Sequence, residues 1–179
     1  MEIYILDRQT QARIYPEAYE MLAAADREFI PPLSSRVSST QKDLSAAAAG
    51  ENISRYFEQL KQQRFAAAFE GDTLIAFVSY IENYCCDVIP PEKCPNIYLS
   101  TLVVSPKARG KGVTKALYGR LFAEYKAFNI FTRTWSTNLA HIKILQGYGF
   151  ETIKVLKNDR GNGIDTVYFE LPANTERQV

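Results

Sequence analysis

The chain has 179 residues, of which 46% are hydrophobic and 23% charged, as expected for one globular domain with a sizeable core. Its formal net charge of +1 gives no reason to expect nucleic acid as a partner. The N-terminus has an acidic residue at position two and no long apolar core, unlike a signal peptide. No stretch approaches the roughly 18 apolar residues of a membrane-spanning helix. We therefore expect a cytoplasmic protein without membrane or nucleic-acid partners.

The three cysteines, Cys85, Cys86 and Cys94, are an odd number in a chain without an export signal. This favours reduced thiols over a disulfide framework. The stretch CCDVIPPEKC lacks paired CxxC spacing, and the single histidine lies far along the chain. We therefore predict free thiols in a loop and no metal site.

The first third of the chain predicts two helices separated by a long irregular stretch. Residues 2–6 are β-branched and aromatic, which is typical of a strand. Apolar residues at helical spacing predict one helix over 15–29 and another over 53–63. The stretch between them, 29–52, contains two prolines that end the first helix, and its polar centre indicates a functional or mobile loop.

The remaining chain alternates apolar runs with turn signals. Strands 64–70 and 73–83 flank Gly71-Asp72, which predicts a hairpin. After the proline- and cysteine-containing loop 84–96, further elements follow in chain order: a buried strand over 96–104, a helix over 113–126, a strand over 129–135, a helix over 139–148, and closing strands over 153–158 and 165–172. We expect a single mixed α/β domain over 1–172 and a frayed tail over 173–179.

Arg109, Gly110, Lys111 and Gly112 stand between the strand 96–104 and the following helix. The first turn of a helix has unpaired N–H groups and the positive end of the helix dipole, so it suits a phosphate. Glycines let a ligand approach the backbone closely. The spacing fits neither the P-loop nor the dinucleotide fingerprint, because Lys111 precedes Gly112 and Lys115 replaces the third glycine. An isolated RGKG could also be a solvated basic turn.

This segment, LSTLVVSPKARGKGVTKAL, together with STNLAHIKILQGYGF, resembles the acetyl-CoA-binding half of the GNAT superfamily of N-acetyltransferases. The family signature R/Q-x-x-G-x-G/A corresponds to 109–114, and Asn138 and Gly149-Phe150 correspond to its second motif. The resemblance implies a mixed α/β (α+β) fold: a mostly antiparallel sheet of six to seven strands, splayed between two of them and flanked by about four helices.

The resemblance implies an acetyl-CoA site. The backbone of 110–114 would hold the pyrophosphate, and the strand Leu102-Val103-Val104 would pair with the pantetheine arm. An N–H near Val103 would be the oxyanion donor. The implied cofactor-binding residues are Leu102, Val103, Val104, Arg109, Gly110, Lys111, Gly112, Val113, Thr114, Asn138 and His141.

The catalytic residues match the family less well. Leu145 stands where many members have a tyrosine that protonates the leaving thiolate, and Tyr148 lies three residues further on. Tyr148 is therefore a candidate acid, or alternatively a packing aromatic. Glu82 and Asp87 are candidate bases or solvated carboxylates. His141 is a candidate base, although a role on the helix surface or beside CoA fits it better. Thr114 is bulkier than the family's usual Gly or Ala.

The acceptor site is expected from the first two helices, their connection and the loop 84–96. Arg36 could pair with an acceptor carboxylate, and Phe29, Tyr80 and Tyr84 could line an apolar wall; a surface arginine and core aromatics are the alternative. The leading hypothesis is direct transfer of acetyl from acetyl-CoA to a primary amine of a small molecule or peptide, by a monomer or homodimer. A non-catalytic acyl-CoA sensor is the alternative, as is a domain that binds another nucleotide. Cys85 or Cys86 as an acyl carrier is a minor variant.

Overall fold

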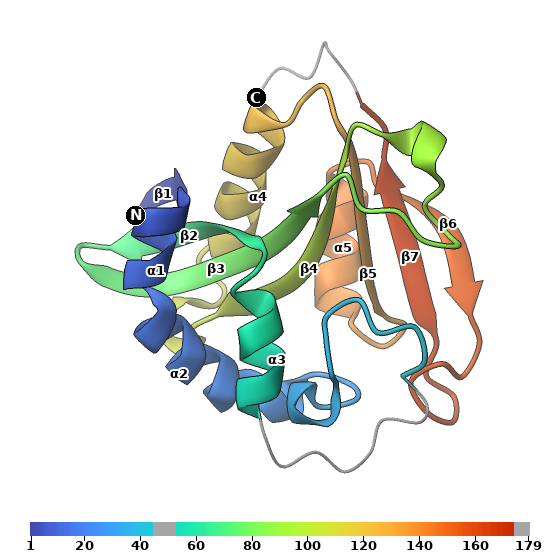
Figure 1. Cartoon of the computed structure of the whole chain (residues 1–179), viewed down its shortest axis with the longest axis horizontal. Coiled ribbons are helices and arrows are strands. Elements are labelled where there is room, and N and C mark those ends of the chain that lie inside the picture. Colours follow the sequence, from blue (N-terminus) through green and yellow to red (C-terminus); the bar gives the residue numbers. More distant parts are fainter. Residues whose placement is uncertain (45–52, 174–179) are drawn as a thin grey trace.

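The structure is a computed structural model that describes residues 1–44 and 53–173. Residues 45–52 of the predicted irregular stretch and 174–179 of the predicted tail lie outside the described residues. One seven-stranded sheet with the order β1-β2-β3-β4-β5-β7-β6 runs through the molecule (Figure 1). Every neighbouring pair of strands is antiparallel except β4 and β5. This confirms the predicted fold class.

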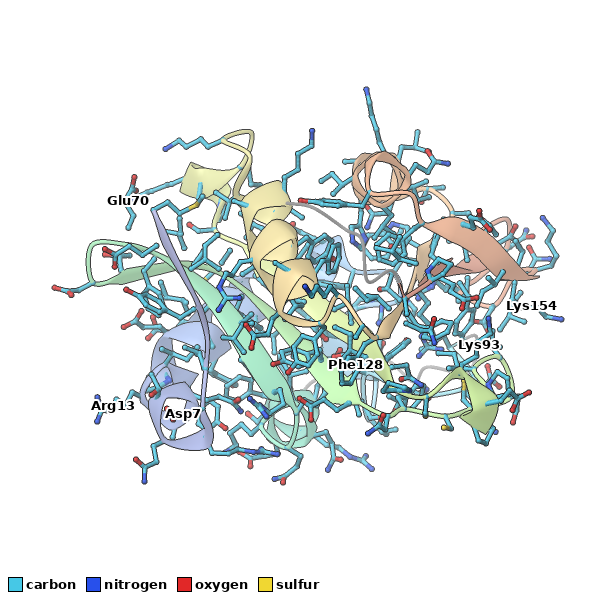
Figure 2. The ribbon with its side chains drawn as sticks, turned by 90° about the horizontal axis from the view of Figure 1, so that it is seen from above. Asp7, Arg13, Glu70, Lys93, Phe128 and Lys154 are labelled. Carbon is cyan, nitrogen blue, oxygen red and sulfur yellow. The ribbon has the colours of Figure 1, made fainter. Side chains whose placement is uncertain are left out.

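The strands lie close to the predicted positions. They are β1 (Glu2–Ile5), β2 (Arg64–Glu70), β3 (Thr73–Glu82), β4 (Asn96–Val104), β5 (Asn129–Trp135), β6 (Glu151–Leu156) and β7 (Thr166–Leu171). The α-helices are α1 (Arg8–Arg13), α2 (Tyr15–Ala25), α3 (Ile53–Leu60), α4 (Val113–Glu124) and α5 (Leu139–Gly147). Figure 2 shows Asp7 and Arg13 at one end of the sheet and Lys154 of β6 at the other.

The sheet is buried on both faces, because successive strand residues point to opposite sides. In β2, Ala66 and Ala68 join the core formed with α4 and α5, whereas Phe65 and Ala67 join the core formed with α1, α2 and α3. We call these the α4/α5 face and the α1–α3 face. The continuous apolar run RFAAAF follows from this double burial.

The described residues contain five α-helices, one more than the approximate number expected. The additional helix is α1, which the sequence analysis missed. Asp7 begins it, because its carboxylate accepts hydrogen bonds from the N–H groups of Gln9 (2.9 Å) and Thr10 (2.8 Å). Helix α2 is shorter than predicted and continues as a 3₁₀ turn, Asp26–Glu28. The Asp26 carboxylate there accepts a hydrogen bond from the N–H of Ser34 (2.7 Å), which fixes the start of the long connection.

Candidate active site

The two parallel strands in the centre of the sheet separate halfway along their length. Pairing between β4 and β5 runs from Asn96 with Asn129 to Leu99 with Thr132 and then stops. At the same point β4 contains a bulge: Thr101 pairs with Ser79 and Leu99 pairs with Tyr80, so Ser100 is an extra residue. A bulge bends its strand and increases the local twist. The bulge therefore accounts for the split, which confirms the expected splay.

Buried hydroxyl groups hold the bulge in place. The Thr101 hydroxyl lies 2.7 Å from the hydroxyl of Tyr56, and the Ser100 hydroxyl lies 2.7 Å from that of Ser79. Ser100 also donates a short hydrogen bond to Gln63 Oε1. Because buried polar groups that lose their partners are costly, these bonds favour one geometry for the split.

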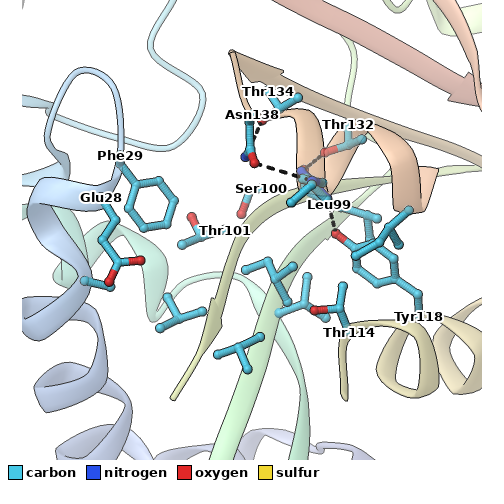
Figure 3. A pocket seen from close by; sticks show the side chains of 18 of the residues that line it. Glu28, Phe29, Leu99, Ser100, Thr101, Thr114, Tyr118, Thr132, Thr134 and Asn138 are labelled. Carbon is cyan, nitrogen blue, oxygen red and sulfur yellow. Dashed lines mark hydrogen bonds between the residues drawn. The ribbon is translucent and has the colours of Figure 1, made fainter. Parts of the chain in front are cut away.

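A cavity of about 720 Å³ occupies the split. Its lining comes from both faces of the sheet, so the cavity passes between β4 and β5. In Figure 3, Glu28 and Phe29 stand on one side of it, and Asn138, Thr134 and Tyr118 on the other. A volume of this size is typical of a small-molecule site.

Ten of the eleven expected cofactor-binding residues line this cavity. They are Leu102, Val103, Val104, Arg109, Gly110, Gly112, Val113, Thr114, Asn138 and His141. Lys111 does not line it and is exposed. The structure thus brings the two sequence motifs together across one cleft.

Beyond the bulge, β4 has a free backbone edge toward the cleft. The Ser105 N–H donates to the carbonyl of Ile75 (2.8 Å), and in antiparallel pairing every second residue bonds to the same neighbour. The N–H of Val103 therefore points to β3, and the N–H groups of Leu102 and Val104 point to the cleft. The sequence analysis expected an oxyanion donor near Val103, and the N–H groups that face the cleft there are those of Leu102 and Val104, because the sequence did not fix which residues of the strand bond to β3.

The turn before α4 has the shape needed for an anion. Gly110 and Gly112 have φ of 73° and 78°, a left-handed conformation that favours glycine. A Cβ at either position would meet nothing within 4 Å, so the space above the turn is open. Gly112 caps α4 without a side-chain hydrogen bond, and the first turn has no acidic residue. The first N–H groups of this helix thus remain available to a ligand.

Arg109 closes one rim of the cavity. Its Nη2 lies 2.9 and 2.8 Å from the two carboxylate oxygens of Glu28, and its Nε donates to the carbonyl of Val104 (3.2 Å). Both ionic side chains are about half exposed, so this pair contributes little to stability. It links the turn before α4 to the end of α2, on the far side of the cleft.

The opposite wall includes Asn138 at the N-cap of α5, His141 of α5 and Tyr118 of α4. Asn138 caps α5 by accepting from the N–H of His141 (3.4 Å), and its Nδ2 donates to the Thr134 hydroxyl (3.0 Å). His141 Nε2 lies 2.8 Å from the Tyr118 hydroxyl. Burial raises the pKa of Tyr118 and lowers the pKa of His141 to about 4, so both are neutral at pH 7.

The shifted pKa of His141 predicts a pH dependence of stability. The unfolded histidine has a pKa of 6.5 and the folded one about 4, so the unfolded state binds more protons between these values. We expect the free energy of unfolding to fall as the pH is lowered from about 6.5 to 4. Urea titrations at several pH values should show a shallower fall for His141→Gln, which removes the only histidine. Equal slopes would contradict the burial of a neutral His141.

The structure does not bring the other catalytic candidates to the cavity. The Tyr148 hydroxyl donates to the carbonyl of Lys115 (2.5 Å), and its ring packs against Phe122. Glu82 lies at the far end of β3, where it accepts from the Tyr125 hydroxyl (2.7 Å) and pairs with Arg64 (3.5 Å). Asp87 is exposed and pairs with Lys42 (2.9 Å). None of these three carboxyl and phenol groups lines the cleft.

Of the four residues expected at the acceptor site, two line the cavity and two do not. Phe29 and Arg36 line the cavity, whereas Tyr80 is buried in the core of the α4/α5 face, and Tyr84 packs on Tyr98 outside the cavity. Cys85, Cys86 and Cys94 are free and also lie outside it.

Sequence reasoning missed Tyr118, Arg133 and Arg160, all of which line the cavity. Tyr118 had a signal, because it lies one helical turn after Thr114 and so on the same face of α4. Arg133 is a charged residue within an otherwise buried strand, NIFTRTW, which is unusual enough to mark a site. Arg160 lies in a polar turn between β6 and β7 and carried no local signal.

Within residues 1–44 and 53–173, no helix is both long enough and apolar enough to cross a membrane. Over the same residues, no group of three or more His, Cys, Asp or Glu side chains is arranged to hold a metal ion.

Comparison with solved structures agrees with this architecture. A protein from Salmonella typhimurium, solved with its cofactor acetyl-CoA, superposes with a TM-score of 0.65 at 14% identity, over 99% of this chain and 96% of that one. A ribosomal-protein-alanine N-acetyltransferase from Brucella melitensis gives a TM-score of 0.64 at 16% identity, over 96% and 99%. An N-acetyltransferase from Staphylococcus aureus gives 0.61 at 17%, over 97% and 98%. At these identities the likeness shows a shared fold.

A search among curated proteins found no match. The model of the acetyltransferase (GNAT) family, however, matches residues 23–150, which is well over half of the chain and includes both motifs and the split between β4 and β5. The chain therefore belongs to the GNAT acetyltransferase family.

Proposed function

We propose that this protein transfers an acetyl group from acetyl-CoA to a primary amine, directly, within a ternary complex. The single observation that carries the proposal is that the N-terminus of α4, whose cap Gly112 makes no side-chain hydrogen bond, and the free edge of β4 open into the same cavity. One end of this cavity suits a diphosphate and the other leads through the sheet to a separate polar region. A non-catalytic acyl-CoA sensor would need the end that suits a diphosphate, but it would not need the end that leads through the sheet.

The residues present fit acetyl-CoA. The N–H groups after Gly112 and the Thr114 hydroxyl would bind the diphosphate, while Arg109 would supply charge at the rim. Leu102 and Val104 would offer backbone groups to the pantetheine arm and the thioester oxygen, and Asn138 would lie on the opposite side. When bound, acetyl-CoA supplies the acetyl group, whose carbonyl carbon exchanges its bond to sulfur for a bond to the acceptor nitrogen.

Two proton transfers must be accounted for in this exchange. In the first, the acceptor ammonium loses a proton to solvent before it can attack. In the second, the thiolate gains a proton on leaving, which balances the proton that the nitrogen loses on becoming an amide. We infer that Tyr118 supplies the second proton, because its hydroxyl is protonated, lines the cavity and is held by His141. It would take over the role of the family tyrosine that Leu145 replaces in this chain. His141 would then be a positioning residue that orients the Tyr118 hydroxyl, and the proton that the acceptor nitrogen loses on becoming an amide would restore Tyr118.

A dedicated carboxylate base is not needed on this model. Among the described residues that line the cavity, Glu28 is the sole carboxylate, and it is paired with Arg109. An amine with a pKa near 10 is about 0.1% neutral at pH 7. We therefore expect kcat/KM to rise with pH up to the pKa of the acceptor amine.

The proposal is tested by calorimetric titration with acetyl-CoA, and then by release of free CoA in the presence of a broad panel of primary amines. Desulfo-CoA and ATP serve as ligand controls. We expect micromolar binding of acetyl-CoA, weaker binding of ATP, and release of CoA that depends on an amine. Binding without release for any amine would favour the sensor. Absence of binding at millimolar acetyl-CoA would exclude both.

A further inference from the structure

Besides Arg109, three arginines from separate segments line the cavity. Arg36 lies in the connection after α2, Arg133 in the middle of β5, and Arg160 in the turn between β6 and β7. Arg36 and Arg160 are 7% and 6% exposed, and Arg133 is partly buried. In Figure 1 the connection that contains Arg36 lies beside the β6–β7 turn, where Arg160 donates to the carbonyl of Ile30 (2.6 Å). We call these three residues the arginine cluster.

The cluster lies on the α1–α3 face of the sheet, across from the proposed acetyl-CoA turn. Arg133 and Phe131 are two residues apart in β5 and so share a face of the sheet, where Phe131 packs on Tyr98. Thr132 and Thr134 point to the opposite face, where the Thr134 hydroxyl accepts a hydrogen bond from Asn138. Ser100 and Thr101, the bulge residues, line the cavity between the two regions. The cluster is thus placed where an acceptor would meet the cofactor from the opposite side of the sheet.

No ion pair neutralises the cluster among the described residues. Arg36 donates to the carbonyl of Pro31 (2.5 and 3.0 Å), and Arg160 donates to the Ile30 carbonyl and the Thr166 hydroxyl (2.8 Å). Arg133 donates to the carbonyls of Ser39 (3.1 Å) and Gln41 (2.6 Å) and to the Tyr168 hydroxyl (3.0 Å).

The nearby carboxylates act on the cluster only from beyond ion-pair distance. Asp26 attracts Arg36 and Asp159 attracts Arg160, without a salt bridge in either case. Burial, followed by repulsion from Arg36 and Arg133, lowers the pKa of Arg160 to about 9. Two buried guanidinium groups and a partly buried one, all with neutral partners, are costly, since buried charges are normally paired.

Each guanidinium also keeps one nitrogen for a ligand. Arg36 Nη1, Arg133 Nε and Arg160 Nη2 have no hydrogen-bond partner within the described part of the chain. Because all three residues line the cavity, these nitrogens are the donors that the cluster can offer to a ligand there. Guanidinium groups bind carboxylates and other oxyanions through paired N–H donors.

We propose that the acceptor is a small primary amine that carries an anionic group, a carboxylate as in an amino acid or a related oxyanion, and that the arginine cluster binds this group. The proposal rests on the acetyl transfer proposed above and specifies its acceptor. A small molecule is favoured over a protein because the 720 Å³ of the cavity must also take the end of the cofactor. Phe29 and Trp135, whose rings are 5.8 Å apart, narrow the remaining space.

The same charges assist the chemistry. A positive environment favours the neutral form of an amine over its ammonium form. One anionic group neutralises one of three positive charges, so the remaining charge still lowers the pKa of the acceptor ammonium. The ammonium proton leaves to solvent, the neutral nitrogen forms its bond to the acetyl carbon, and the carbon–sulfur bond breaks with its electron pair on sulfur. The nitrogen then loses a second proton, which balances the one that the thiolate gains. No oxidant or further reactant is required.

The test compares acceptors that differ only in charge. Amino acids are paired with their carboxamides, and 2-aminoethylphosphonate, ethanolamine and putrescine represent phosphonate, neutral and cationic amines. We expect kcat/KM for an amino acid or the phosphonate to exceed that of the neutral partner at least about 10-fold. Arg36→Gln and Arg160→Gln should each reduce this preference about 10-fold, mainly through KM, with unchanged acetyl-CoA affinity. Arg120→Gln, which removes an exposed arginine paired with Glu124 outside the cavity, is the matched control.

A second measurement does not depend on turnover. Calorimetric titration of the protein–CoA complex with an amino acid and its carboxamide reports anion binding directly. If the acid binds preferentially but no amine releases CoA, the arginine cluster is an anion site and the proposed acetyl transfer is wrong. If amines release CoA but the carboxamide or putrescine is bound and used as well as the acid, the proposal is overturned and the transfer stands. Turnover of peptides but not of any small anionic amine would likewise overturn it.

Discussion

Replacing Gly112 with tryptophan is expected to weaken acetyl-CoA binding by about 100-fold or more. Gly112 has a φ of 78°, caps α4 and lines the cavity, and the space above it is open. An indole there would occupy the position that the diphosphate takes over the first turn of the helix. Loss of that interaction removes charge-assisted hydrogen bonds to several N–H groups at once. Calorimetric titration with acetyl-CoA, compared with the unmodified protein, measures the effect.

The matched control is Gly71→Trp. Gly71 also has a positive φ, 58°, and open space at its Cβ, but it lies in the β2–β3 hairpin away from the cavity. A non-glycine residue in the left-handed region costs about 1 to 2 kcal/mol, so both variants should lose similar stability. Only Gly112→Trp should lose affinity. Equal affinities for acetyl-CoA in the two variants would exclude the α4 turn as the diphosphate site.

The strands were predictable from the sequence because the sheet is buried on both faces. Runs such as RFAAAFE and NIYLSTLVV are long, apolar and bounded by turn residues, and β2, β4 and β5 have the predicted limits. The short helix α1 was missed because Asp7 defines it through hydrogen bonds to Gln9 and Thr10 rather than through apolar periodicity. Its six residues are too few for a periodic pattern to emerge.

Most of the proposed cofactor half of the site was predictable because it comes from one segment, residues 102–114. Arg109 to Thr114 form one turn whose residue types and spacing carry the signal, and ten of the eleven expected residues line the cavity. The exception is Lys111. Its neighbours Gly110 and Gly112 line the cavity, whereas the Lys111 side chain is exposed and does not. The parity of β4 could not be predicted, because the bulge at Ser100 shifts the register in a way that the sequence does not reveal.

The acceptor half could not be predicted in the same way. Arg36, Arg133 and Arg160 are separated by more than a hundred residues in all and meet only through the tertiary fold. Their hydrogen bonds to Pro31, Ile30, Ser39 and Gln41 hold one connecting segment against the sheet. Arg36 was named as a candidate partner of an acceptor carboxylate, and Arg133 stands out in a buried strand, but no local pattern shows that these two residues meet each other and Arg160.

Tyr118→Phe is expected to lower kcat by about 100-fold with little change in acetyl-CoA affinity. The phenylalanine ring keeps the stacking on Phe122, 5.1 Å between centroids, and loses only the hydroxyl that faces His141. A general acid contributes about 10²- to 10⁴-fold. We expect the lower end, because a thiolate with a conjugate-acid pKa of roughly 8.5 leaves fairly well unaided. Single-turnover release of CoA with a saturating amine measures the step.

Tyr148→Phe provides the comparison that decides between the two tyrosines. Its hydroxyl donates to the carbonyl of Lys115 outside the cavity, so its loss should change kcat by no more than about 2-fold. If instead Tyr148→Phe is slow and Tyr118→Phe is not, the sequence-based assignment is correct, and Tyr148 must reach the thiolate in a conformation that differs from the one described. Two slow variants would implicate the packing of the shared aromatic cluster, since both rings contact Phe122. Two unaffected variants would mean that the thiolate leaves without a protein acid and is protonated later by solvent. The weak basicity of a thiolate permits this.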